Sequence, residues 1–184
     1  KILKLLEPDQ EEEKEGPPVA RYNKPPKQTF LQTSTRISNF SNRREPKSTD
    51  VIVYIALSCD LMHPGVIARL QAAKAQGTFL YVGLWDDEMI RYYRGSKYPL
   101  QGTQERLLMA LAMKYVDDVV IGAPYIVTED LIKSLNIKKV VHVRSREDQP
   151  KAEFTDLDPF SVPKYLDMFV ELPPVENDLT VEDI

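Results

Sequence analysis

The sequence is poor in the residues that build disulfide scaffolds and metal centres. Its 184 residues include one cysteine, Cys59, and two histidines. A single cysteine excludes a disulfide framework and fits a reducing compartment. Two histidines leave little room for a His-rich metal centre, so we expect no metal site in this chain.

Long apolar runs and a strong excess of one charge are also absent. No run approaches the roughly 20 apolar residues of a membrane span, so no transmembrane segment is expected. Residues 1–6 are short and run into acidic sequence, unlike a signal peptide. With 24 Lys+Arg against 28 Asp+Glu the formal charge is −4, which argues against general binding to nucleic acid or an acidic membrane.

The first 50 residues have the composition of a linker. They hold six of the 14 prolines and an acidic run at 11–15. Proline pairs cannot lie inside a helix or a central strand, so we interpret 1–50 as a linker and docking segment that is solvated over 8–28. Short helices are expected at 2–6 and 33–40, the second docked on the core by Phe30, Leu31, Ile37 and Phe40.

The last 41 residues are strongly acidic. Residues 144–184 hold 4 basic and 11 acidic side chains and little apolar content. We therefore expect an irregular acidic tail that packs on the preceding domain and forms no second core.

The middle segment, 51–143, has the pattern of an α/β domain. Apolar runs without alternation are typical of parallel strands buried on both faces. Alternation of such strands with helices predicts right-handed βαβ units and a Rossmann-like, three-layer parallel sheet. Strands are expected at 51–57, 78–84, 116–121 and 139–143, and helices at 64–74, 87–93, 104–114 and 129–135. The first helix is expected to begin at Pro64 and to stop at Gly77. Thr103 and Thr128 are expected to cap the third and fourth helices. Leu107, Leu108, Leu111 and Ala112 are expected to form the buried face of the third helix.

The end of the first expected strand is where this architecture would hold a phosphate. Ligands of open parallel sheets bind at the carboxyl ends of the strands, at the point where strand order reverses. Here the strand ends at Ser58-Cys59-Asp60, directly before the start of a helix, and a helix start attracts anions.

The residues after that strand resemble the nucleotide-binding signature of the cytidylyltransferases, D-G-x-F-D-x-x-H-x-G-H. The matching run is Asp60-Leu61-Met62-His63-Pro64-Gly65-Val66. Further matches follow in the family's order: Tyr93-Arg94-Gly95, Tyr98-Pro99, Glu105-Arg106, 114–120 and 121–125.

The flanking segments narrow the resemblance to the ethanolamine-phosphate cytidylyltransferase family, whose members have two tandem halves. The chain is similar to the linker and second half over about 28–184. The residues that carry this are Phe30-Leu31-Gln32-Thr33-Ser34 and Glu45-Pro46 upstream, and Asp158-Pro159-Phe160, Pro163-Lys164 and Leu179-Thr180 downstream.

The resemblance implies a reaction in which CTP and phosphoethanolamine give CDP-ethanolamine and pyrophosphate, for phosphatidylethanolamine synthesis. It implies Mg²⁺ and CTP as cofactor and substrate of the active half, with none certain in this one. It also implies that the two histidines of the signature donate to phosphates, that its first glycine lets backbone approach the nucleotide, and that the aspartate before it binds the amino alcohol.

This copy of the signature is degenerate. His63 and Gly65 match, but Val66 stands where the second histidine is expected and cannot donate a hydrogen bond. The first glycine is Leu57, expected to crowd the nucleotide, and the substrate-binding aspartate is Ala56. The signature's aromatic is Cys59, and no counterpart of the family's late Ser/Thr-rich motif follows 143. Because one lost transition-state donor costs about 10²–10³ in rate, we expect no competent catalytic residue here.

Some anion-binding residues remain, each with a structural alternative. His63, Gly65, Arg94 and Arg106 are candidates for vestigial phosphate binding. His63 would otherwise cap its helix and satisfy a buried carbonyl, and Arg106 would be a surface ion-pair residue beside Glu105.

For the other polar and aromatic candidates the structural interpretation is favoured. We expect Asp60 to shape the turn and cap the helix, Cys59 and His142 to be packing residues, and Asp117 and Asp118 to mark a strand edge, not a metal site. Trp85, Tyr92 and Tyr93 either stack a base or cover the end of the sheet, and the second is favoured.

These observations predict a non-catalytic half whose partner is the catalytic N-terminal half of the same enzyme. A homodimer is a further assembly that the sequence leaves open, and a catalytically competent or nucleotide-binding regulatory half is the alternative function. The expected compartment is the cytoplasm, with peripheral association at the endoplasmic reticulum as an option.

Overall fold

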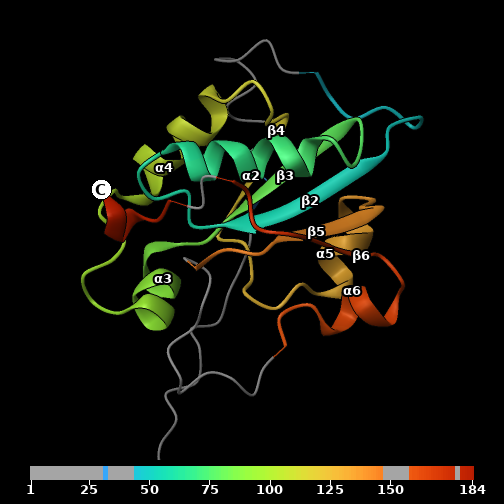
Figure 1. Ribbon diagram of the computed structural model, residues 1–184. Helices are drawn as coiled ribbons and strands as arrows, with labels where there is room; N and C mark the ends of the chain where they lie inside the picture. Colours follow the sequence, from blue (N-terminus) through green and yellow to red (C-terminus); the bar gives the residue numbers. More distant parts are fainter. Residues whose placement is uncertain (1–30, 33–43, 147–157, 177–178) are drawn as a thin grey trace, which may run out of the picture.

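A computed structural model of the protein describes residues 31–32, 44–146, 158–176 and 179–184. It contains a six-stranded sheet of order β1-β4-β3-β2-β5-β6 (Figure 1). The strands are β1 (Leu31–Gln32), β2 (Ile52–Leu57), β3 (Phe79–Leu84), β4 (Asp118–Ile121), β5 (Lys139–Val143) and β6 (Phe169–Leu172). The helices are α2 (Pro64–Lys74), α3 (Asp87–Arg94), α4 (Thr103–Ala112), α5 (Glu129–Ser134), α6 (Ser161–Tyr165) and the 3-10 helix η3 (Val181–Asp183).

Five of the six strands run parallel, which confirms the predicted α/β class. Strand β2 lies at the centre, paired with β3 on one side and β5 on the other. From β2 the chain builds outward through β3 and β4, then returns to place β5 and β6 on the opposite side. The point where strand order reverses therefore lies between β2 and β5, at the end of the strand for which a phosphate site was predicted.

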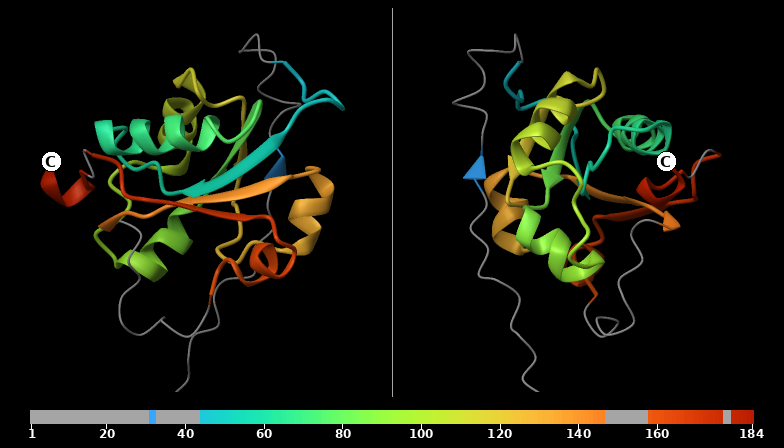
Figure 2. Two further views of the ribbon diagram at one scale, coloured as in Figure 1. Left: turned by 45° about the vertical axis from the view of Figure 1, so that its right-hand side comes forward. Right: turned by 90° about the vertical axis from the view of Figure 1, so that its left-hand side faces the viewer.

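The sheet is buried on both faces, as the apolar strand runs predicted. On one face Val53, Ile55 and Leu57 of β2 pack with α2 and α4. On the other, Ile52 and Tyr54 pack with α5 and α6. Burying such a side chain contributes about 1.5–3 kcal/mol, so the two cores hold the three layers seen in Figure 2 together.

Glycine is required at one position of the central strands. Tyr54 is fully buried on β2, and a Cβ at Gly83 of β3 would collide with its hydroxyl group. The absence of a side chain at Gly83 therefore lets an aromatic ring pack across two neighbouring strands.

The starts of α2 and α5 agree with the predicted signals, and the start of α4 does not. Pro64 opens α2, and the Thr128 hydroxyl caps α5 by accepting from the Leu131 N–H at 3.2 Å. The cap predicted at Thr103 is wrong by one residue, because Gly102 is the N-cap of α4 and its N–H donates to Glu105 at 2.8 Å.

The predicted buried face of α4 is also partly wrong. Leu107 is buried, but Leu108 keeps 64% of its surface exposed and Ala112 is exposed. The helix is rotated so that Arg106 and Ala110 face inward, both with no exposed surface. The inward face of α4 includes an arginine whose partners come from several elements. The periodicity of apolar residues does not predict such a face.

The prediction of an irregular tail is wrong for the described part of 158–184. This part forms α6 and β6, and β6 extends the sheet by pairing with β5, with Val140 opposite Phe169. The tail does pack on the domain, through Val170 and Leu172 on one core and Phe160 on the other. High acidic content obscured a strand of only four residues whose single charge, Glu171, faces solvent.

Several expectations for the N-terminal segment lie outside the described residues. These are the solvated linker over 8–28 and the helices at 2–6 and 33–40. Residues 31–32 are described as β1, whose backbone pairs antiparallel with β4 so that Leu31 lies opposite Ile121. Among the described residues no helix is both long enough and apolar enough to cross a membrane.

Candidate functional site

The turn that joins β2 to α2 has a strained backbone. Cys59 has a φ of 53° and Leu61 a φ of 44°, both in the left-handed region. This region costs an L-residue about 1–2 kcal/mol, so tertiary contacts must hold the turn in this form. Ser58 and Asp60 are buried in the same turn, which shows how closely it is packed.

Asp60 holds the turn against a loop that lies 40 residues further along the chain. Its carboxylate accepts from the N–H groups of Leu100 at 2.8 Å and Gln101 at 2.9 Å. The Gln101 side chain in turn accepts from the Leu61 N–H at 3.0 Å. The predicted turn-shaping role of Asp60 is confirmed, but the predicted cap is not, because His63 is the N-cap residue of α2.

Arg106 is the polar centre of this end of the molecule. Its guanidinium donates to the carbonyls of Ser58 at 2.5 Å and Trp85 at 2.9 Å, and its Nε donates to the Gln101 carbonyl at 3.1 Å. It also forms an ion pair with Asp87 at 2.7 Å. The interpretation as a surface ion pair beside Glu105 is wrong, because Arg106 is fully buried and its acidic partner begins α3.

The same cluster sets the charge state of Asp87. Partial burial by itself would raise the pKa of this carboxyl group. Hydrogen bonds from the Thr103 hydroxyl, at 2.7 Å, and from Arg106 outweigh burial and lower the pKa of Asp87 below its usual value. The ends of β2 and β3 and the starts of α3 and α4 are thus joined by one ionic cluster.

The remaining signature residues are divided between the turn and the core. His63 is buried at the start of α2, and Gly65 is the second residue of that helix. Val66 has no exposed surface and lies in the core cluster with Leu70. Leu57 is also packed in this core, so the crowding of a nucleotide expected from its side chain is not the arrangement observed.

Arg94 lies next to the loop that Asp60 holds. It ends α3, and its guanidinium carbon is 4.4 Å from the centre of the Tyr98 ring, a cation–π contact. The structure therefore brings Arg94, Asp60 and Arg106 to one end of the sheet, but it places Arg106 inside the protein with its donors directed at protein acceptors.

The aromatic residues at this end stack on one another. Tyr93 and Tyr125 have ring centres 3.9 Å apart and nearly parallel planes, and Trp85 lies 5.8 Å from Tyr125. Burial raises the pKa of Tyr93 to about 12. The favoured prediction, that these rings cover the end of the sheet, agrees with this packing. Tyr125 was missed as a member because it follows β4, far from Trp85 in sequence.

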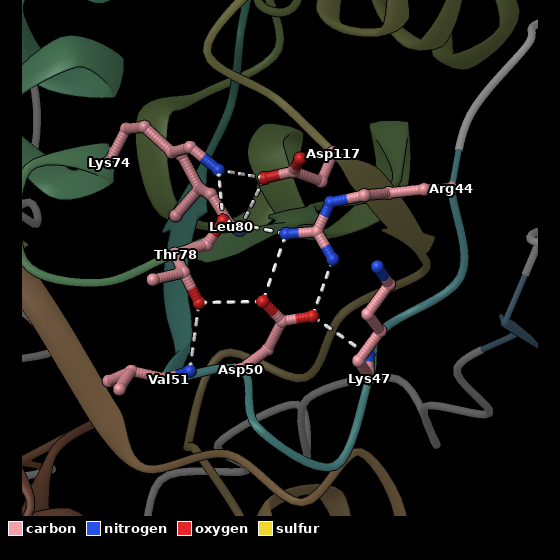
Figure 3. Close-up of polar contacts among 8 residues, drawn as sticks. All are labelled: Arg44, Lys47, Asp50, Val51, Lys74, Thr78, Leu80 and Asp117. Carbon is pink, nitrogen blue, oxygen red and sulfur yellow. Dashed lines mark hydrogen bonds and ion pairs between the residues drawn. The ribbon is translucent and has the colours of Figure 1, made fainter.

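Two other polar candidates make separate contacts. His142 packs against Phe160, with ring centres 4.9 Å apart, as predicted for a packing residue. Asp117 pairs with Lys74 and accepts from the Leu80 N–H at 2.7 Å, at the amino end of β3 (Figure 3). No group of three or more His, Cys, Asp or Glu residues in the described ranges is arranged to hold a metal ion.

Figure 3 shows that this amino end carries a second ionic cluster, centred on Asp50. Asp50 accepts from Arg44 at 2.5 and 3.0 Å, from the Lys47 N–H at 2.7 Å and from the Thr78 hydroxyl at 2.7 Å. The hydrogen bond from Arg44 is the largest of the effects that hold the pKa of Asp50 far below its usual value. This cluster fixes residues 44–50 against the strand β3, at the opposite end from the β2–α2 turn.

The fold and the turn together define a class of protein. The sequence profile of the cytidylyltransferase-like family matches residues 58–157, which begin at the β2–α2 turn and include α2 to β5. The chain belongs to this family. A lipopolysaccharide core biosynthesis protein from Thermoplasma volcanium has the same fold, with a TM-score of 0.52 at 20% identity over 70% of this chain and 99% of that one.

Within the family, this chain is similar to ethanolamine-phosphate cytidylyltransferases. It is 40% identical to that of Dictyostelium discoideum over 159 residues, which is 84% of this chain and 42% of the relative. It is 40% identical to that of Arabidopsis thaliana over 142 residues, 76% of this chain and 33% of the relative. For the mouse protein, identity is 35% over 145 residues, 78% and 35% of the two lengths. The chain thus spans less than half the length of these curated relatives.

Proposed function

We propose that this chain is the linker and second half of an ethanolamine-phosphate cytidylyltransferase, and that this half supports the catalytic first half without turning over substrate. In the whole enzyme a phosphate oxygen of phosphoethanolamine would bond to the α-phosphorus of CTP while the bond to pyrophosphate breaks. The products are CDP-ethanolamine and pyrophosphate. The similarity to curated enzymes of this name over 76–84% of the chain supports the reaction class.

The observation that carries the non-catalytic part of the proposal is the burial of Val66. The residue stands where the signature has its second histidine, and it is part of the hydrophobic core with no exposed surface. An aliphatic side chain in a core cannot donate a hydrogen bond to a developing negative charge. The donor is therefore missing, and the position is not open to a ligand.

Two further arrangements support the same conclusion. Ala56 carries no carboxylate for an amine, and it packs against the core of the opposite face. Arg106, the basic residue retained from the family pattern, directs its guanidinium at three carbonyls and Asp87. Its charge is already balanced by the protein, so binding a phosphate would require the cluster to break.

Mg²⁺ and CTP belong to the active half in this proposal. Mg²⁺ in nucleotide sites is held mostly by phosphates together with one or two carboxylates. Asp60 supplies the carboxylate of the β2–α2 turn, and it accepts hydrogen bonds from two backbone N–H groups. The carboxylate at this turn therefore serves the protein, and a metal would enter only with a bound nucleotide.

The test is a turnover assay on the purified chain with CTP, phosphoethanolamine and Mg²⁺. We expect no CDP-ethanolamine from the parent or from His63→Ala. A two-half relative from the family serves as the positive control. Product that is formed by the parent and lost in His63→Ala would overturn the proposal, because it would show that the single retained histidine is sufficient for chemistry.

The alternative function is a regulatory half that binds a nucleotide without reaction. It is favoured by the retained pair His63 and Gly65 at the start of α2 and by Arg94 nearby. Calorimetric titration with CTP and with CMP separates the two functions. Binding that is lost in His63→Ala, in the absence of turnover, would select the regulatory half.

The partner in this proposal is the catalytic N-terminal half of the same enzyme, and a homodimer is the alternative assembly. The proposed compartment is the cytoplasm, with peripheral association at the endoplasmic reticulum. Size-exclusion chromatography of this chain, alone and mixed with the first half, distinguishes the two assemblies.

A further inference from the structure

The C-terminal residues 179–184 return to the carboxyl ends of the strands. Figures 1 and 2 show η3 at this end of the molecule, beside the first turn of α2. Residues 144–184 were predicted to be an irregular tail, and nothing in their composition indicated a contact here. The position is notable because ligands of open parallel sheets bind at this end.

Two contacts with residues far away in the sequence hold this segment at the carboxyl end of the sheet. The Tyr98 hydroxyl donates to Glu182 at 3.0 Å, and Tyr98 lies in the loop that Asp60 ties to the end of β2. Arg146, three residues after β5, forms an ion pair with Asp183 at 2.9 Å. The segment is therefore tied to the chain that leaves β5 and to the α3–α4 loop, and Asp60 fixes that loop beside the end of β2.

The segment is packed and not merely tethered. Thr180 and Val181 each keep only 5% of their surface exposed. Asp183 also accepts from the Thr180 N–H at 2.8 Å, which closes the turn. A short turn with two buried residues, held at both sides, has a defined position over this part of the fold.

The segment 179–184 is negatively charged, as a phosphate is. Glu182 and Asp183 supply two carboxylates, and each uses a donor at this end, the Tyr98 hydroxyl and the Arg146 guanidinium. Arg94 lies over the same Tyr98 ring. A phosphate group at this end would compete with the two carboxylates for these donors and would be repelled by the carboxylates, so the segment disfavours a phosphate there.

We propose that residues 179–184 form an acidic cover across the β2–β5 switch point, which keeps phosphate-bearing ligands out until it is displaced. For its choice of ligand, a nucleoside triphosphate, the proposal rests on the nucleotide-binding regulatory half given above as the alternative function. Both holding contacts are near the surface, where such pairs are weak, so the cover can open. The apparent affinity for ligand is then reduced by the fraction of molecules that are uncovered.

The test compares the parent chain with the double variant Glu182→Ala/Asp183→Ala, which leaves Tyr98 and Arg146 in place. The matched control is Glu45→Ala/Glu171→Ala, which removes two exposed carboxylates elsewhere. Hydrogen exchange is followed over residues 58–63 and 94–101, and CTP binding is measured by calorimetry. We expect exchange in both segments to rise and CTP affinity to increase about fivefold in the cover variant, with no change in the control.

Both changes are required, and either one without the other overturns the proposal. Unchanged exchange would show that the segment does not cover this end. Faster exchange without tighter CTP binding, including no detectable binding in any variant, would show that the segment does not exclude this class of ligand. The outcome is independent of the turnover assay, because the proposed function fails only on His63-dependent product from the parent chain.

Discussion

At the scale of single residues, Arg106 shows how one side chain can change its role within a family fold. The resemblance predicts a phosphate-binding cation, whereas the structure shows a buried cation whose acceptors are Ser58, Trp85, Gln101 and Asp87. Ser58 lies in the β2–α2 turn, Trp85 and Asp87 lie between β3 and the start of α3, and Gln101 lies in the loop between α3 and α4. The arginine therefore stabilises the arrangement of the loops and does not wait for a ligand.

Arg106→Ala should lower the free energy of unfolding by about 3 kcal/mol, because it removes a buried guanidinium and leaves the buried Ser58 carbonyl and the partly buried Asp87 carboxylate without their donor. The stability of Arg106→Lys should lie between those of the parent and Arg106→Ala, since an ammonium group cannot reproduce the planar fork of hydrogen-bond donors. Urea denaturation measures both. Arg91→Ala, on the exposed face of α3, is the control and should change stability by no more than about 0.5 kcal/mol. A loss below about 1 kcal/mol in Arg106→Ala would contradict this role.

At the scale of elements, the packing of β6 and α6 on β5 contributes a part of the stability that depends on pH. His142 on β5 lies opposite Glu171 on β6 and packs on Phe160, just before α6. Burial is the main reason that the pKa of His142 is lowered, helped by the charges of Arg69, Lys164 and Arg144 and opposed by Glu171. The neutral imidazole is thus the form that fits between β6 and α6.

Because the folded-state pKa of His142 lies below the unfolded value of about 6.5, the unfolded chain binds more protons as the pH falls between these two values. This contribution to stability is complete above about pH 6.5 and is lost as the pH falls toward the folded pKa. The parent should lose more unfolding free energy than His142→Gln between about pH 7.5 and about pH 5. Equal losses in urea denaturation at the two pH values would show that His142 does not contribute.

At the scale of the whole molecule, the two ends of the sheet have separate tasks. The carboxyl end holds the β2–α2 turn, the Arg106 cluster and the C-terminal segment. The amino end holds residues 44–50 through Asp50 and Thr78, so the chain that leads into the domain is fixed to it. Residues 44–50, the described residues that lead into β2, are therefore held in place at the amino end of the sheet.

Asp50→Asn should release this connection without unfolding the domain. The neutral amide weakens the paired contact with Arg44, which is bidentate only with a carboxylate. Hydrogen exchange should become faster at the amides of Lys47 and Val51, while the midpoint of thermal unfolding changes little. Glu45→Gln is the matched control. Unchanged exchange in Asp50→Asn would mean that Arg44 and Thr78 hold the segment without it.

Local patterns predicted most of the fold but little of the site. The four predicted strands and the start of α2 depend on residues close together in sequence, so runs of apolar residues and Pro64 were sufficient. The rotation of α4, the strand β6 and the contact of Glu182 with Tyr98 were missed, because each depends on a partner far away in the chain. The sequence also did not predict that the side chain of Leu57 packs in the core.

The sequence by itself determined the α/β class and the family, because composition, periodicity and motif order are properties of neighbouring residues. Only the tertiary structure decided what the remaining polar groups do. Whether Arg106 binds a ligand or the protein depends on which acceptors surround it, and those acceptors come together only when the strands, helices and loops are packed.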